Sequence, residues 1–104
     1  MSVLQGVLQE EINRLEKNIS SYEEMLSFLP KGSIFIRKMG NSSFAYRKRK
    51  EKGRVVSKYL GNVNKEDVKK ELSYFDEYKR LMANIRVAKQ ELNKIRKAYK
   101  VYGR

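Results

Sequence analysis

Basic side chains gather in one short stretch of the chain. Residues 31–58 contain ten Lys or Arg against a single acid, Glu51, which gives this stretch a net charge of +9 out of +12 for all 104 residues. Residues 1–30, in contrast, carry a net charge of −3. Guanidinium and ammonium groups at this density attract polyanions and neutralise phosphate groups. The basic stretch therefore predicts binding to a nucleic acid or to an anionic membrane surface.

The sequence offers little for catalysis. It contains no His and no Cys, which removes the commonest metal ligand, the commonest general base, disulfides and thiolate chemistry. Glu10 and Glu11, like Glu23 and Glu24, are neighbours that point to different sides of a helix, so neither pair forms a carboxylate dyad. No glycine-rich phosphate loop or Ser-x-x-Lys motif occurs. We therefore expect no enzyme activity, no metal site and no cofactor.

Helices are predicted at both ends of the chain, because apolar residues recur there at intervals of three or four. The first helix, residues 1–29, ends before Pro30, and the second, residues 64–102, begins at the cap residue Asn64. The pattern predicts that the two helices pair as an antiparallel coiled coil. The second helix is longer, so its opening turns, which include Val68 and Leu72, are expected to cover the middle segment. The apolar positions are Leu4, Leu8, Ile12, Leu15, Ile19, Tyr22, Leu26 and Leu29, and then Val68, Leu72, Phe75, Tyr78, Met82, Ile85, Ala88, Leu92, Ile95, Tyr99 and Tyr102.

The middle segment, residues 31–61, is predicted to form a three-stranded antiparallel sheet. Residues 33–39, 43–49 and 54–60 are rich in Ile, Phe, Tyr and Val, with Gly-containing turns between them. If Met39 lies opposite Ser43, and Arg49 opposite Arg54, alternation sorts the side chains into two faces. The apolar face, expected to lie under the second helix, has Ile34, Ile36, Phe44, Tyr46, Val55 and Tyr59. The basic face, expected to lie in solvent, has Phe35, Arg37, Ala45, Arg47, Arg49, Arg54, Val56 and Lys58.

The basic face is the predicted binding site. A small sheet can enter the DNA major groove, where Arg and Lys neutralise phosphates and Arg reaches guanine edges. Two arginines opposite each other repel unless a polyanion lies over them. Phe35 is placed to touch a thymine methyl group or to stack on an unpaired base. The predicted nucleic-acid-binding residues are Arg37, Arg47, Arg49, Arg54, Lys58, Lys48, Lys50, Lys52 and Phe35.

Short motifs in this region resemble the arm-site DNA-binding domains of phage and transposon tyrosine recombinases. They are Gly32-Ser33-Ile34, Gly40, Phe44-Ala45-Tyr46-Arg47, Gly53-Arg54, Ser57-Lys58 and Asn64-Lys65-Glu66-Asp67-Val68. The resemblance covers residues 32–76 and implies a three-stranded sheet, backed by one helix, that reads DNA through Arg37, Arg47, Arg49, Arg54 and Lys58. The chain departs from that family in its long first helix, its extended second helix and its lack of a catalytic domain, so recombination is not implied. The whole layout also resembles an uncharacterised prokaryotic helix-sheet-helix family found near mobile elements.

We therefore expect a single elongated α+β domain over residues 1–104, cytoplasmic, that binds duplex DNA in preference to RNA and does not enter a membrane. One alternative is a coiled-coil interaction or dimerisation module whose basic sheet meets an acidic protein partner. Another is the binding of single-stranded nucleic acid or structured RNA, which requires Phe35 and Tyr46 to be exposed. A homodimer through the helices is a further possibility, since Tyr99 and other apolar residues extend beyond a two-helix seam. Those residues are Val101, Tyr102, Val3, Val7, Met25, Leu81 and Val87.

Overall fold

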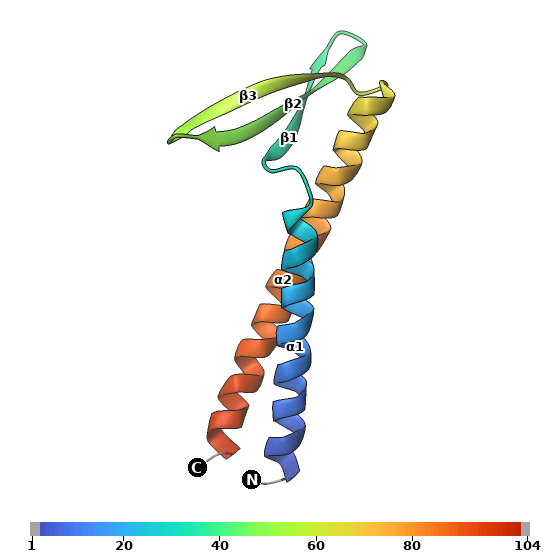
Figure 1. Ribbon diagram of the computed structural model, residues 1–104. Helices are drawn as coiled ribbons and strands as arrows, with labels where there is room; N and C mark the ends of the chain where they lie inside the picture. The colour runs from blue at the N-terminus through green and yellow to red at the C-terminus, as the bar shows by residue number, and fades with distance from the viewer. Residues whose placement is uncertain (1–2, 103–104) are drawn as a thin grey trace. The chain divides into compact units, whose positions relative to one another are not determined.

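The computed structural model describes residues 3–102 and has the predicted α+β class, with two helices flanking a three-stranded antiparallel sheet (Figure 1). The elements are α1 (Val3–Ser27), β1 (Ser33–Met39), β2 (Ser42–Glu51), β3 (Arg54–Asn62) and α2 (Glu66–Tyr102). The chain, expected to form one domain, divides into two compact units. The helical unit is Met1–Phe28 with Arg80–Arg104, and the sheet unit is Leu29–Lys79, which includes the first turns of α2.

In the helical unit, α1 packs against the C-terminal part of α2. Among the ion pairs that join the helices, Glu16 pairs with Arg96 at 2.9 Å, and Glu23 with Lys89 at 3.7 Å. The later residue of α1, Glu23, pairs with the earlier residue of α2, Lys89. The helices are therefore antiparallel, as the coiled-coil pattern predicted. Leu81, expected outside the seam, is buried instead. The core consists of Ile12, Leu15, Ile19, Ile85, Ala88 and Leu92, with Tyr22, Leu26, Ile95 and Tyr99 packed against it.

The strands of the sheet unit are joined in the order β1-β2-β3 by two-residue turns. Met39 pairs with Ser42 across Gly40 and Asn41, and Glu51 pairs with Arg54. The predicted register is therefore wrong at both turns. In the second turn both residues have positive φ, 50° at Lys52 and 80° at Gly53, which is the type I′ geometry that matches the twist of a hairpin.

The two register errors have different consequences for the faces. The turn between β2 and β3 is two residues shorter than predicted, so the same side chains of these strands still share a face. The turn between β1 and β2 is one residue shorter, which moves β1 to the opposite face. One face thus has Phe35, Arg37, Phe44, Tyr46, Lys48, Lys50, Val55, Ser57 and Tyr59. The other has Ile34, Ile36, Lys38, Ala45, Arg47, Arg49, Glu51, Arg54, Val56 and Lys58.

The first turns of α2 cover the second of these faces, here called the helix-side face; the first is called the open face. Ala45 is 0% exposed and Val68 of α2 is 1% exposed. A Cβ atom at Gly61 would lie 3.2 Å from Cγ2 of Val68, so the absence of a side chain there lets the helix approach the sheet. The prediction that α2 covers the face of Phe44, Tyr46 and Tyr59 is therefore wrong.

Within residues 3–102, neither helix combines the length with the apolar composition that crossing a membrane requires.

Candidate nucleic-acid interface

Four aromatic rings form a row across the open face. Phe35, Tyr46 and Tyr59 are direct register partners on β1, β2 and β3, and Phe44 lies beside Tyr59. The ring centroids of Phe35 and Tyr46 are 5.2 Å apart, with 12° between their planes. Those of Tyr46 and Tyr59 are 5.3 Å apart at 58°. We call these four residues the aromatic row.

The aromatic row contains every aromatic residue of the three strands, and none of its members is buried. Tyr59 is 55% exposed, and the other three rings are partly exposed. Aromatic side chains contribute most to stability when buried, yet here the helix packs on Ala45 and Gly61 of the other face. The rings lie against one another and leave a continuous aromatic surface.

Basic side chains lie over the rings of this surface. The Arg37 guanidinium carbon is 5.8 Å from the centroid of the Tyr46 ring, and Lys48 Nζ is 5.3 Å from that of Phe35. Both distances allow a favourable cation–π contact. Lys50 lies on the same face and is exposed. None of these three forms an ion pair with a carboxylate in residues 3–102, so their charge remains available to a ligand.

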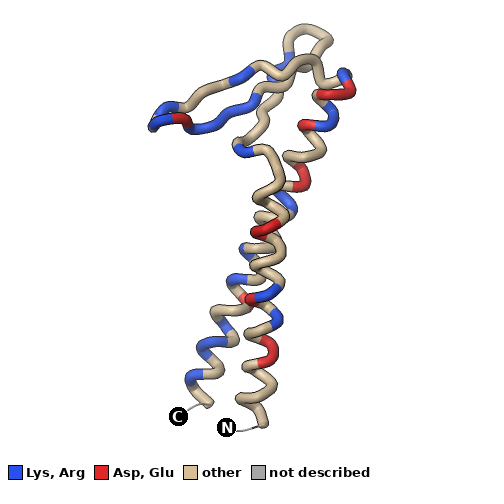
Figure 2. Tube along the Cα trace, in the orientation of Figure 1, with Lys and Arg blue, Asp and Glu red and all other residues tan. Residues whose placement is uncertain are grey.

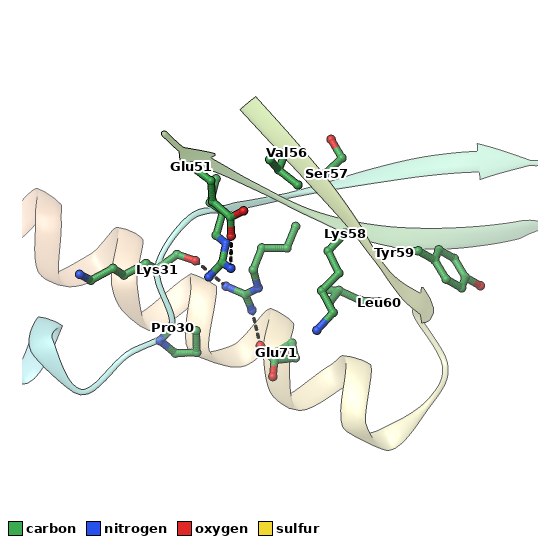
Figure 3. Close-up of a pocket in the computed structure, with 11 residues that line it drawn as sticks. Pro30, Lys31, Glu51, Val56, Ser57, Lys58, Tyr59, Leu60 and Glu71 are labelled. Atoms are coloured by element: carbon green, nitrogen blue, oxygen red, sulfur yellow. Dashed lines mark hydrogen bonds and ion pairs between the residues drawn. The ribbon is translucent and has the colours of Figure 1, made fainter. Parts of the chain in front are cut away.

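The arginines of the helix-side face are engaged within the protein instead. Arg47 forms an ion pair with Glu71 of α2 and donates a hydrogen bond of 3.1 Å to the Lys31 carbonyl oxygen, both drawn as dashed lines in Figure 3. Its side chain is only 12% exposed. Arg49 pairs with Glu51 in the same strand. These contacts reduce the charge that this face can offer to a phosphate.

A groove of about 670 Å³ lies on the helix-side face, within the sheet unit. Lys58 extends into it, whereas the Tyr59 ring points away (Figure 3). Its walls contain both basic groups and the carboxylates of Glu51 and Glu71. Its lining residues are Pro30, Lys31, Arg47, Arg49, Glu51, Val56, Ser57, Lys58, Tyr59, Leu60 and Glu71.

The structure distributes the nine predicted binding residues over two faces and a turn. Phe35, Arg37, Lys48 and Lys50 are on the open face. Arg47, Arg49, Arg54 and Lys58 are on the helix-side face, and Lys52 is in the turn between β2 and β3. The predicted basic face is therefore wrong for β1, because Phe35 and Arg37 lie on the opposite face from Arg47, Arg49, Arg54 and Lys58, which do share one face as predicted.

The predicted repulsion between Arg49 and Arg54 is absent, since Arg49 lies opposite Val56 and Arg54 opposite Glu51. Sequence reasoning also assigned Tyr46, Tyr59 and Phe44 to a covered face. The Gly-Asn dipeptide at the first turn is the signal that could have placed Phe35 on the same face as these residues, because such pairs are typical of two-residue hairpin turns. No group of three or more acidic residues within residues 3–102 is arranged to hold a metal ion.

Comparison with known proteins gives a family but no described activity. Neither a curated protein nor a solved structure matches the chain. A family model described as Domain of unknown function (DUF6788) matches residues 5–70. The matched part contains nearly all of α1, the whole sheet and the start of α2, including Val68. Because the match covers more than half of the chain, the protein belongs to this family, the Domain of unknown function (DUF6788) family.

Proposed function

We propose that the protein binds nucleic acid through the three-stranded sheet. The observation that carries this proposal is the surplus of positive charge that the protein itself does not neutralise. Of the ten basic residues between 31 and 58, two, Arg47 and Arg49, form ion pairs with carboxylates within the described residues. Basic residues lie along β2 and β3 (Figure 2). The acid among them is Glu51, next to the turn that joins these strands. A surface of this kind neutralises phosphates and gains affinity from the release of counterions.

The form of the sheet unit also supports this function. It is a three-stranded antiparallel sheet backed by the first turns of a single helix, the layout that the resemblance to arm-site DNA-binding domains implies. That resemblance implies duplex DNA as the partner and the arginines of one face as the contacts. Two of those arginines are paired with carboxylates, so the open face supports the proposal better than the helix-side face does.

The test is fluorescence anisotropy with labelled single strands and duplexes, titrated over a range of roughly 20 to 300 mM salt. For duplex we expect a log–log slope of about −4 to −7, the value for roughly four to eight neutralised phosphates. The variant K48E/K50E should lose most of the affinity. Its matched control, K94E/K97E, makes the same change in net charge in the helical unit and should lose much less.

Two outcomes would contradict the proposal. One is the absence of binding to either probe at the lowest salt concentration. The other is an equal loss of affinity in K48E/K50E and K94E/K97E, because this would show that binding follows net charge alone and not the sheet.

The helical unit favours a second function, self-association. Apolar side chains near the chain ends of both helices are exposed, and Val3 and Val101 are the most exposed of them. The ends of α1 and α2 that carry the termini lie close together within this unit (Figure 1). A second copy that covered these side chains would place two sheets on one particle. Sedimentation equilibrium tests this, and a V3S/V101S variant should shift a dimer toward monomer. A wild-type monomer at all concentrations would contradict it.

A further inference from the structure

We propose that the aromatic row is a stacking platform for unpaired bases, so that the preferred ligand is a single-stranded nucleic acid. This inference depends on the proposed function, the binding of nucleic acid by the sheet. It differs from the sequence-based expectation of duplex DNA, and it assigns the contact to Phe35, Tyr46, Tyr59 and Phe44 rather than to the arginines of the helix-side face.

The location of the rings supports a stacking platform. All four aromatic side chains of the strands lie on the face that α2 leaves open, although burial would give each of them more stability. A sheet that needed them only for its core would place them toward Val68, which instead lies against Gly61, the register partner of the buried Ala45. Cross-strand stacking explains why neighbouring rings touch. It does not explain why the whole set lies on the open face.

The geometry of the rings also suits unpaired bases. Phe35 and Tyr46 are nearly parallel, with 12° between their planes, and Tyr59 extends the row onto β3. Bases of a single strand have free π-faces that stack on such side chains with little dependence on sequence. Sheets that display aromatic side chains in this way bind about two or three bases. In a duplex the base faces are covered by their neighbours, so the rings would contribute little to duplex binding.

Basic groups lie beside the rings on the open face. Along β2, Lys48 and Lys50 continue the open face on one side of the rings, and Arg37 lies opposite Phe44 on the other side. A strand of nucleic acid that places its bases on the rings would therefore meet cations for its phosphates on both sides of the row. On the helix-side face, in contrast, Glu71 and Glu51 offset the charges of Arg47 and Arg49.

The test compares single-stranded and duplex probes on the full chain. The probes are labelled oligo(dT) and oligo(rU) of about 15 nucleotides and a DNA duplex of equal length. We expect the single strands to bind more tightly than the duplex. The variant Tyr59→Ser should weaken binding to both single strands about tenfold and leave the duplex affinity unchanged. Its matched controls are Tyr74→Ser, an exposed tyrosine of α2 in the same unit, and Ile36→Ser, an equally exposed apolar residue of the helix-side face. Each control should change affinity less than twofold.

Photocrosslinking tests the same proposal on the wild-type protein, so the result does not depend on whether a variant folds. Single strands with 5-iodouracil are irradiated on the wild-type protein, and the crosslinked peptides are identified by mass spectrometry. Adducts on members of the aromatic row would support the platform, and adducts confined to the helix-side face or to the helical unit would overturn it.

The two proposals fail in different ways. If single strands and duplex bind equally and Tyr59→Ser weakens neither, the stacking platform is wrong while nucleic-acid binding stands. If neither probe binds, both proposals are wrong.

Discussion

On the helix-side face of the sheet, Arg47 and Arg49 are each paired with a carboxylate, whereas on the open face Arg37 and Lys48 lie over aromatic rings. The strands supply basic residues to both faces. The faces differ in their carboxylates, because Glu71 of α2 pairs with Arg47 and Glu51 of β2 pairs with Arg49, whereas no acid of the described residues pairs with the open face. The density of Lys and Arg in a segment therefore indicates the class of partner, but the carboxylates contributed from elsewhere decide which of those charges are available.

The two faces also differ in what packs on them. The helix-side face is covered where its side chains are smallest, at Ala45 and Gly61, and not where they are most apolar. Close approach of the helix needs the small residues, and it then buries Val68 almost completely. Shape, more than hydrophobicity, has determined which face is covered.

The largest effect on stability is expected for Val68→Ala, which removes the side chain that joins α2 to the helix-side face. Val68 is 1% exposed, so the lost burial and the cavity together should destabilise the sheet unit by about 2 kcal/mol. Hydrogen exchange of the strand amides measures this directly, even if the two compact units unfold separately. Ile36→Ala on the same face is the control and should cost less than about 0.5 kcal/mol, since Ile36 is largely exposed. A loss below that value for Val68→Ala would contradict the packing described.

A smaller loss is expected for Glu71→Gln, which leaves the largely buried Arg47 guanidinium without its carboxylate. Hydrogen bonds to charged groups contribute about 1.5 to 3 kcal/mol, and the partial exposure of Glu71 places the expected loss near the lower end. The control is Asp76→Asn, which removes an exposed pair with Lys79 in the same helix and should cost less than about 0.5 kcal/mol. Nucleic-acid affinity should not fall in Glu71→Gln, because the sheet becomes more positive. A fall would show that the Arg47 pair organises the ligand site.

The helices and strands could be predicted from the sequence, but the side chains that share each face of the sheet could not. Repeats of three and four predicted both helices, and runs of β-branched and aromatic residues predicted all three strands to within a few residues. The faces depend on turn length, and a three-residue span such as Gly40 to Ser42 also allows the two-residue turn that moves β1 to the opposite face. The two-residue turn between β2 and β3 requires a positive φ at Lys52, which few non-glycine residues adopt, but missing it left the faces of these two strands unchanged.

The site was only partly predictable for a related reason. The concentration of basic residues is evident in the sequence, but the pairing of Arg47 with Glu71 joins residues 24 positions apart, on elements whose contact depends on the register. The aromatic row became recognisable only when Phe35, Tyr46 and Tyr59 were aligned across three strands. A small residue such as Ala45 between Phe44 and Tyr46 was the signal for the covered face.

On the open face, the stacked pair of Phe35 and Tyr46 should show a coupling of about 1 kcal/mol in a double-mutant cycle of Phe35→Leu and Tyr46→Leu. Leucine keeps the apolar character of each position and removes the ring, so the coupling reports the ring contact. Urea unfolding, followed by the exchange of strand amides, gives the four free energies. A coupling indistinguishable from zero would mean that the rings are not held against each other, and would weaken the case for a preformed stacking surface.

The smallest effects on stability are expected when one basic side chain is neutralised on each face of the sheet. Arg49→Gln breaks the pair with Glu51, in which both side chains are about half exposed, and Lys48→Gln removes a cation over Phe35. Each should change the free energy of unfolding by less than about 0.5 to 1 kcal/mol. Their effects on single-strand affinity should differ, with about a fivefold loss for Lys48→Gln and less than half of that for Arg49→Gln, whose charge Glu51 already offsets. Equal losses in an anisotropy titration at the same salt concentration would mean that the ligand reads the charge of the hairpin as a whole, and the distinction between the faces would then concern packing alone.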